Sequence, residues 1–324
     1  MQLHPISLAI AALFAAKGRR SRSLSSSGAL AALVLGYAAL ANPLKLFGVA
    51  LLGFYLAGSR ATKFKASIKA SYEEPDAPAP PPSSTSPAKA GGGGGNRTAA
   101  QVACNALVGC ACAVAWRVLY SGESALSAGE QWEGERWCVV ERFGEGDARR
   151  YSRALVLAAV AFWGACCGDT FASELGILSL RPPILLTTLR PTPRGTNGAV
   201  SPWGTLVSLL GGALVGVLAA GTMALQGQLG ACGARGMTEV VVVGAAAGLG
   251  GSALDSLLGA LFQPTYFSRT RKLVVHHPPS ASPKDDDVIV LPGTALFGAL
   301  LSNNAVNFLS TAGVVAVAGW WALL

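Results

Sequence analysis

The feature that most limits the fold of this chain is a series of long apolar segments separated by short polar ones. Inside each segment the apolar residues are continuous and do not alternate with polar ones, which favours membrane helices over a membrane β-barrel. Several segments reach, or come close to, the length that a helix needs to cross a bilayer. The candidate spans are 3–16, 27–41, 43–59, 99–119, 153–168, 201–224, 238–262 and 295–321.

The charge content supports this interpretation. Only 13% of the 324 residues are charged and 51% are hydrophobic, whereas about 25% of a typical soluble domain is charged. So few charges cannot surround a soluble core of this size with a hydrated shell. We therefore predict an all-α, polytopic transmembrane helical bundle with about six to eight spans. The organelle stays open between endoplasmic reticulum, plastid and other endomembranes.

The chain divides into three predicted parts. Residues 1–70 form N-terminal membrane spans, and the Pro- and Gly-rich residues 71–98 form a disordered linker. Residues 99–324 form the main membrane domain, with loops at 120–152 and 263–294.

The cations are distributed unequally over the loops. In an eight-span layout one side carries 17 Lys and Arg residues and the other side 7, so the positive-inside rule places the first side in the cytosol. Both termini, and the loop 120–153, then lie on the far side. The basic residues are spread over separate loops, which argues against nucleic acid as a partner. The sequon at Asn96 is predicted to escape glycosylation.

The seven cysteines match neither an even-numbered disulfide framework nor the spacing of a zinc site. Cys110 and Cys112, and the adjacent Cys166 and Cys167, lie in or beside apolar segments. We interpret the cysteines as small buried hydrophobic residues.

Four carboxylates are candidates for function because they lie near or inside predicted spans, where ionisable groups are unfavourable: Asp169, Glu174, Glu239 and Asp255. Asp169 and Glu174 are five residues apart and differ by roughly 140° around a helix. They could hold one Mg²⁺ together if the helix breaks at Gly168-Asp169. The alternative is a helix cap at Asp169 with local hydrogen bonds from nearby hydroxyls. For Glu239 we favour a first-turn carboxylate stabilised by the helix dipole.

Two further polar segments are candidate binding elements. The segment from Arg190 to Gly198 combines cations, hydroxyls and glycines, and its Arg194, Gly195, Thr196 and Asn197 suit a phosphate site. An ordinary basic turn is the alternative. A second set either lines a polar site in the bundle or cross-links helices: Ser173, Ser256, Asn303, Asn304 and Asn307.

The chain resembles the transmembrane protein nineteen family of integral membrane proteins. Five segments match in a fixed order: 59–66 (SRATKFKA), 168–176 (GDTFASELG), 193–198 (PRGTNG), 250–259 (GGSALDSLLG) and 303–308 (NNAVNF). Residues 73–98 and 120–153 depart from the family pattern and look like lineage insertions. The plant and cyanobacterial branch includes a phytyl-phosphate kinase, and the order of motifs is also similar to that of membrane dolichol and phytol kinases.

The resemblance implies roles for individual residues. It suggests a kinase that transfers a phosphoryl group from a nucleoside triphosphate to an isoprenoid monophosphate, with membrane lipid or isoprenoid phosphate as partner. Asp169 and Glu174 would hold Mg²⁺, and Asp255 would be a second metal ligand or an acid–base group. The residues expected at the phosphates are Lys63, Lys65, Arg194, Gly195, Thr196 and Asn197.

Two other functions remain open at this stage. A transporter or flippase would use Asp255 and the asparagine cluster deep in the bundle, with glycine-rich helices that break easily. A non-catalytic membrane scaffold would use the same polar residues only to join helices.

Overall fold

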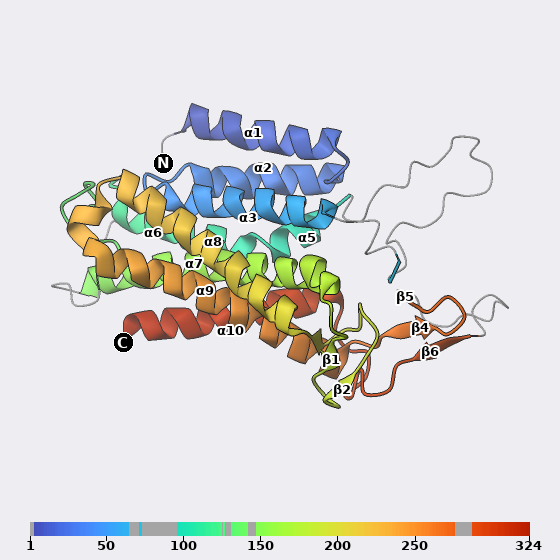
Figure 1. The fold of residues 1–324 in the computed structure, drawn as a ribbon. Coiled ribbons are helices and arrows are strands. Elements are labelled where there is room, and N and C mark those ends of the chain that lie inside the picture. Colours follow the sequence, from blue (N-terminus) through green and yellow to red (C-terminus); the bar gives the residue numbers. More distant parts are fainter. Residues whose placement is uncertain are drawn as a thin grey trace.

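The computed structural model describes residues 3–64, 71–72, 96–124, 126, 131–141, 147–275 and 287–324. It is a helical bundle, 66% helix, which confirms the predicted all-α membrane fold. Figure 1 shows both chain termini at one end of the bundle and the short strands at the other. The helices are α1 (Pro5–Arg20), α2 (Ser26–Leu40), α3 (Leu46–Lys63), α5 (Ala99–Cys104), α6 (Leu107–Tyr120), α7 (Asp147–Leu175), α8 (Pro202–Leu225), α9 (Gln228–Phe262) and α10 (Asn303–Leu323), with a 3₁₀ turn η1 (Gly176–Leu178) after α7.

Four helices of the described chain are long and apolar enough to cross a membrane. They are α7 together with η1, α8, α9 and α10, whereas α2 and α6 are shorter apolar helices. These four helices pack mainly against one another, and α3 packs against α7 and α8.

The predicted break between the second and third apolar segments is confirmed. Asn42 lies between α2 and α3 and is fully buried. Its side-chain oxygen accepts a hydrogen bond from the Leu44 N–H at 3.0 Å, and its Nδ2 donates to the Ala113 carbonyl at 2.7 Å. Asn42 therefore closes the α2–α3 hairpin and fixes it to α6.

Several helix bounds differ from the predicted spans, and α7 and α9 begin earlier because they continue past the charges that end an apolar run. Helix α7 covers 147–175 and not only 153–168, and it runs unbroken through Gly168 and Asp169. Helix α10 begins at 303 and not at 295. Helix α9 begins at 228 and contains a kink at Gly233, whose φ of 62° is accessible to glycine.

Two small antiparallel sheets lie at the end of the bundle away from the termini (Figure 1). The first has the order β2-β1-β3, with β1 (Ile184–Leu185), β2 (Arg190–Pro191) and β3 (Ala199–Val200). The second lies inside the predicted loop 263–294 and has the order β5-β4-β6, with β4 (Tyr266–Ser268), β5 (Leu273–Val275) and β6 (Val288–Val290). Hydrogen bonds from the Ser268 hydroxyl and the Thr270 N–H lower the pKa of Asp287 to about 2, so this carboxylate stays ionised beside the sheet.

The last residues of the predicted linker 71–98 are structured. The Asn96 N–H donates to the Arg22 carbonyl at 2.7 Å, and the Arg97 N–H donates to the Ser23 carbonyl at 3.0 Å. The Ser25 N–H in turn donates to the Arg97 carbonyl at 3.0 Å. This segment is therefore attached to the turn between α1 and α2. The disorder predicted for 73–95 concerns residues outside the described part of the chain.

The crossing of α7, α8 and α9 depends on glycines. A Cβ atom at Gly168 would lie 2.5 Å from the Gly248 Cα, and one at Gly212 would lie 2.2 Å from the Gly244 carbonyl oxygen. Small residues allow helix backbones to approach closely in a membrane. These glycines therefore allow the backbones of α7, α8 and α9 to contact one another directly.

An ion pair inside the bundle corrects the interpretation of Glu239. This residue is not in a first turn, because α9 starts eleven residues earlier, at Gln228. Its carboxylate instead pairs with Arg153 of α7, which is 1% exposed. Arg153 also donates to the Ala322 carbonyl and lies over the Trp321 ring at 4.8 Å. It therefore joins α7, α9 and the end of α10.

The cysteine interpretation was right for three buried thiols and wrong for one pair. Cys110, Cys166 and Cys167 are buried free thiols, whereas Cys138 and Cys232 form a disulfide. The two partners are 94 residues apart, and an odd total of cysteines hides such a pair in the sequence. The bond attaches the segment 131–141 to the first turns of α9.

Reduction of this disulfide is expected to lower the thermal stability of the protein. A bridge closing a loop of 94 residues stabilises by up to about 4–5 kcal/mol in the loop-entropy description. The measurement is the melting temperature of the purified full chain with and without a thiol reductant. Cys232→Ser should melt at the lower temperature in both conditions, and the free-thiol control Cys104→Ser should respond to the reductant as the wild type does. A melting temperature of Cys232→Ser equal to that of the oxidised wild type would contradict the expectation.

Candidate functional site

The candidate site is a cavity of about 1260 Å³, and its polar residues on α7, α9 and α10 lie near the ends of these helices that are joined to the sheets. Its walls come from α1, α2, α3, α5, α7, α8, α9, α10 and the segment 194–201. It contains most of the side chains that the sequence singled out: Asp169, Ser173, Glu174, Arg194, Gly195, Thr196, Asn197, Asp255, Ser256, Asn303, Asn304 and Asn307.

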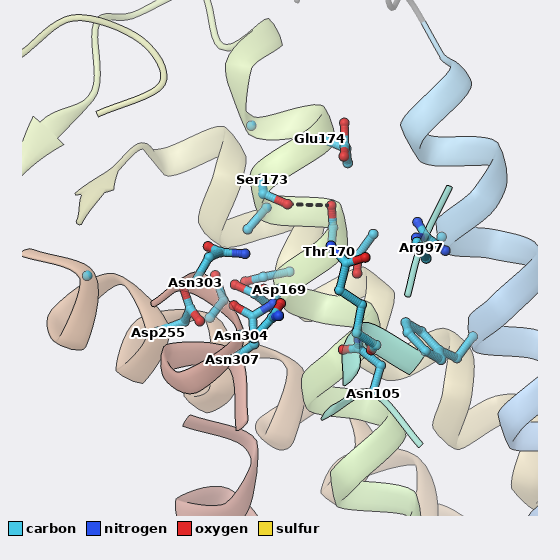
Figure 2. A pocket seen from close by; sticks show the side chains of 18 of the residues that line it. Arg97, Asn105, Asp169, Thr170, Ser173, Glu174, Asp255, Asn303, Asn304 and Asn307 are labelled. Carbon is cyan, nitrogen blue, oxygen red and sulfur yellow. Dashed lines mark hydrogen bonds between the residues drawn. The ribbon is translucent and has the colours of Figure 1, made fainter. Parts of the chain in front are cut away.

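The centre of the polar wall is a pair of carboxylates from two helices. Asp169 of α7 lies near enough to Asp255 of α9 for direct electrostatic repulsion, and Figure 2 shows both side chains in one group with Asn304 and Asn307. Among the described residues, no salt bridge joins either carboxylate to a Lys, Arg or His. Two carboxylates placed together without such a cation cannot both ionise at little cost, so the pair favours a bound cation or a shared proton.

Helix α10 supplies the neutral partners of Asp255. The Ser310 hydroxyl donates to Asp255 Oδ2 at 3.4 Å. With the Asn307 amide oriented so that both of its polar atoms are satisfied, Nδ2 donates to Asp255 Oδ2 and to the Asn303 carbonyl, each at 3.0 Å. The asparagine cluster therefore both lines the cavity and joins α9 to α10, so the two roles weighed for it occur together.

Glu174 lies elsewhere on α7. Because α7 is unbroken at Gly168-Asp169, the condition for Asp169 and Glu174 to converge is not met. Glu174 lies five residues on, about 7.5 Å further along the helix axis, and points away from the Asp169 group in Figure 2. Asp169 is in the helix interior, so it is not a cap either. The predicted local hydrogen bonds do occur. The Thr170 hydroxyl donates to the Cys166 carbonyl, and the Ser173 hydroxyl donates to the Thr170 carbonyl.

The segment 190–198 lines the cavity, but its side chains already have partners. The Arg194 guanidinium donates to the Tyr72 hydroxyl and to the Ser179 carbonyl, both at 2.6 Å, and lies 4.8 Å from the Tyr72 ring centroid. Thr196 is buried and donates to the Pro193 carbonyl at 2.7 Å. The Asn197 amide donates to the Pro264 carbonyl at 3.0 Å. These three side chains hold the segment in place.

Glycines set the path of the same segment. Gly195 has φ 86° and Gly198 has φ 80°, values that favour glycine. A Cβ atom at Gly198 would come within 2.3 Å of the Ala260 side chain. The segment therefore packs directly on the last turn of α9, which brings backbone rather than free side chains to the cavity.

The two predicted lysines are not placed at the cavity. Lys63 is exposed at the end of α3 and is not among the lining residues. Lys65 lies outside the described residues.

Sequence reasoning missed several polar residues of the site, among them Arg97, Asn105 and Ser310. Arg97 and Asn105 line the cavity (Figure 2) but were read as part of a linker and as part of an apolar span. Ser310 was hidden in the last apolar segment. The only feature of these residues in the sequence is a polar side chain in or beside an apolar segment. Many residues share this feature, so it does not identify them as site residues.

The wall opposite the polar residues is apolar. It is built by α1, α2 and α3 and includes Phe14, Ala15, Ala32, Leu35, Leu51 and Phe54. The cavity is therefore amphipathic, as expected for a ligand with a polar head and a hydrocarbon chain.

Comparisons with known proteins agree with this architecture. The family model described as "Integral membrane protein DUF92" matches residues 9–315. Protein PGR of Arabidopsis thaliana is 37% identical over 161 residues, which cover 48% of this chain and 51% of that protein. An uncharacterized membrane protein of Methanocaldococcus jannaschii is 42% identical over 99 residues, covering 31% of this chain and 37% of its own length.

A third relative, an uncharacterized membrane protein of Synechocystis, is 45% identical over 67 residues, covering 21% of this chain and 26% of its own length. The matched stretches thus span about half or less of these relatives. No solved structure matches this chain.

Proposed function

Because this chain belongs to the DUF92 family of integral membrane proteins, we propose that it is a membrane phosphotransferase acting on an isoprenoid phosphate. The reaction would convert a phytyl-like monophosphate into its diphosphate, with a nucleoside triphosphate as donor. The proposal joins the shared membrane architecture to the chemistry of one cavity.

The observation that carries the proposal is the pairing of Asp169 and Asp255 inside an amphipathic cavity. A soluble metabolite has no apolar chain that would pack against the wall built by α1, α2 and α3. A purely apolar lipid would have no use for two carboxylates. A lipid phosphate fits both walls.

The carboxylate pair also fits a magnesium ion. Hard oxygen ligands suit Mg²⁺, which typically takes one or two carboxylates and completes its shell with phosphates and water. In this proposal Asp169 and Asp255 hold the ion, and Glu174 no longer does. When bound, Mg²⁺ would neutralise negative charge on the donor phosphates. Among the described residues no cluster of three or more His, Cys, Asp or Glu is found.

The transfer itself needs little proton chemistry. An oxygen of the monophosphate forms a bond to the γ-phosphorus, and the bond from that phosphorus to the β–γ bridging oxygen breaks, which releases the nucleoside diphosphate. The attacking oxygen is already anionic, so no general base has to remove a proton. The protein's contribution is to position the two phosphate groups and to compensate their charge.

A substrate screen tests the proposal directly. The purified full chain in lipid nanodiscs is incubated with Mg²⁺, each γ-labelled nucleoside triphosphate and a panel of prenyl monophosphates of different chain length. We expect label in a prenyl diphosphate with at least one pair. Absence of labelled diphosphate across the panel, from protein that is folded by thermal melting, would refute the kinase proposal.

The contact between Asp255, Ser310 and Asn307 supports transport as a second candidate function. An ionisable residue at a junction of two helices inside a bundle is a frequent feature of transport pathways. Flux of a lipid phosphate across proteoliposomes that is lost in Asp255→Asn, without formation of diphosphate, would favour the transporter.

A further inference from the structure

We propose that Arg97 is the anchor for the phosphate group of the lipid acceptor, and that the wall formed by α1, α2 and α3 holds its hydrocarbon chain. This inference rests on the proposed function for the identity of the lipid. Binding can be measured without any phosphoryl transfer, so the two ideas can fail separately.

The backbone of Arg97 is fixed at the cavity. Residues 96–97 form hydrogen bonds with the turn that joins α1 to α2, and Leu24 and Arg97 form a parallel β-bridge. The close approach requires Gly28, because a Cβ atom there would lie 2.0 Å from the Arg97 carbonyl oxygen. These contacts all use main-chain atoms of Arg97, so they hold the residue in position without engaging its side chain.

The guanidinium group of Arg97 has no protein partner in the part of the chain that the structure describes. Arg97 is half-buried and lines the cavity. Three other arginines at helix ends or inside the bundle are engaged: Arg117 with Glu123, Arg153 with Glu239, and Arg194 with Tyr72 and Ser179. An arginine stays charged at any physiological pH and offers a planar fork that matches phosphate oxygens. Arg97 is thus a cation available to an anionic ligand.

The surroundings of Arg97 favour a lipid over a nucleotide as the source of that phosphate. Leu24, in the turn that holds Arg97, lines the cavity just before α2 begins. Ala32 and Leu35 of α2 line the cavity further along the same helix. Phe14 and Ala15 of α1 line the same wall. In Figure 2 Arg97 lies on the side of α7 away from Asp255 and Asn303, near the helices of the apolar wall. A chain could therefore extend along α1 and α2 from a phosphate held by Arg97.

Further support comes from the charge balance of the cavity. Two carboxylates without a bound cation would repel a lipid phosphate, so an acceptor needs a cation held apart from them. Arg97 meets this need from a different wall. The same position would let the protein distinguish a prenyl monophosphate from the uncharged prenol.

The test is equilibrium binding of farnesyl monophosphate and of farnesol to the full chain in nanodiscs, without nucleotide or Mg²⁺. The wild type should bind the monophosphate at least about tenfold more tightly than farnesol, as expected for a charge-assisted contact in a partly buried site. Arg97→Gln should lose most of this preference while its affinity for farnesol stays the same. Arg20→Gln is the matched control, because Arg20 is an exposed cation at the same end of the bundle and does not line the cavity.

The outcomes separate the possibilities. Equal preference for the monophosphate in the wild type and Arg97→Gln, with equal melting temperatures, would overturn the assignment. The assignment would also be overturned if Arg97→Gln bound ATP with Mg²⁺ about tenfold more weakly but kept its affinity for farnesyl monophosphate. Arg97 would then bind the nucleotide and not the lipid. Arg97-dependent binding of the monophosphate by a protein that transfers no phosphate would support this inference and count against the kinase.

Discussion

Asp169→Asn is expected to reduce phosphoryl transfer by at least about a thousandfold while the protein stays folded, since loss of a group that stabilises transition-state charge has effects of this order. The substitution keeps the size of the side chain and removes one of the two carboxylates at the centre of the polar wall. It should also relieve the repulsion between Asp169 and Asp255, so the melting temperature should stay the same or rise. Loss of activity together with retained stability is typical of a functional charge.

The measurement is the initial rate of prenyl diphosphate formation across a series of Mg²⁺ concentrations. Asp255→Asn should cause a loss of similar size, because the structure places it in the same pair. Glu174→Gln is the matched comparison: it lines the same cavity and sits on the same helix, but away from the pair. If Glu174→Gln abolishes transfer and Asp255→Asn does not, the pairing of Asp169 with Asp255 is not the functional one.

Gly248→Leu is expected to prevent accumulation of folded protein. A Cβ atom at this position would lie 2.5 Å from the Ser208 carbonyl oxygen and 2.7 Å from the Gly212 Cα. Both are main-chain atoms of α8, so no side-chain rotation can relieve the clash and the helices must separate. The destabilisation should reach at least about 3 kcal/mol, the upper part of the range for overpacked sites.

Size-exclusion chromatography of detergent extracts and thermal melting would measure this effect. Gly221→Leu is the control, because Gly221 lies in α8 with open space around the added Cβ and the same change of residue type. Folded yields that are equal for the two variants would show that the α8–α9 crossing is not as tight as the structure indicates.

The sequence was sufficient for the architecture because the apolar segments are long and continuous. It also located the α2–α3 hairpin at Asn42-Pro43, since a proline after a polar residue between two apolar runs favours a turn. Most of the candidate site could be found as well. A carboxylate or an asparagine in an apolar helix is rare enough to be conspicuous, as Asp169, Asp255 and Asn307 illustrate.

The pairing of those residues could not be derived from sequence. Asp169 and Asp255 lie on different helices, and their approach depends on glycine contacts such as Gly168 with Gly248. The nearby Glu174 was the natural partner along the chain, but an unbroken helix turns it away. Arg97 was hidden for another reason: its hydrogen bonds to residues 22–25 use main-chain atoms, which leave no pattern in the sequence.

The disulfide and the polar residues of the cavity lie toward opposite ends of the bundle. This separation bears on how the protein is oriented in the membrane. Bonds such as Cys138–Cys232 persist in oxidising compartments, so we expect the end that holds it to face a lumen or the outside. In that orientation the end of the bundle that carries the sheets would face the reducing side of the membrane. The positive-inside count of Lys and Arg predicts the same orientation in an eight-span layout. A thiol reductant that cannot cross lipid can therefore report, in sealed vesicles, which way each copy was inserted.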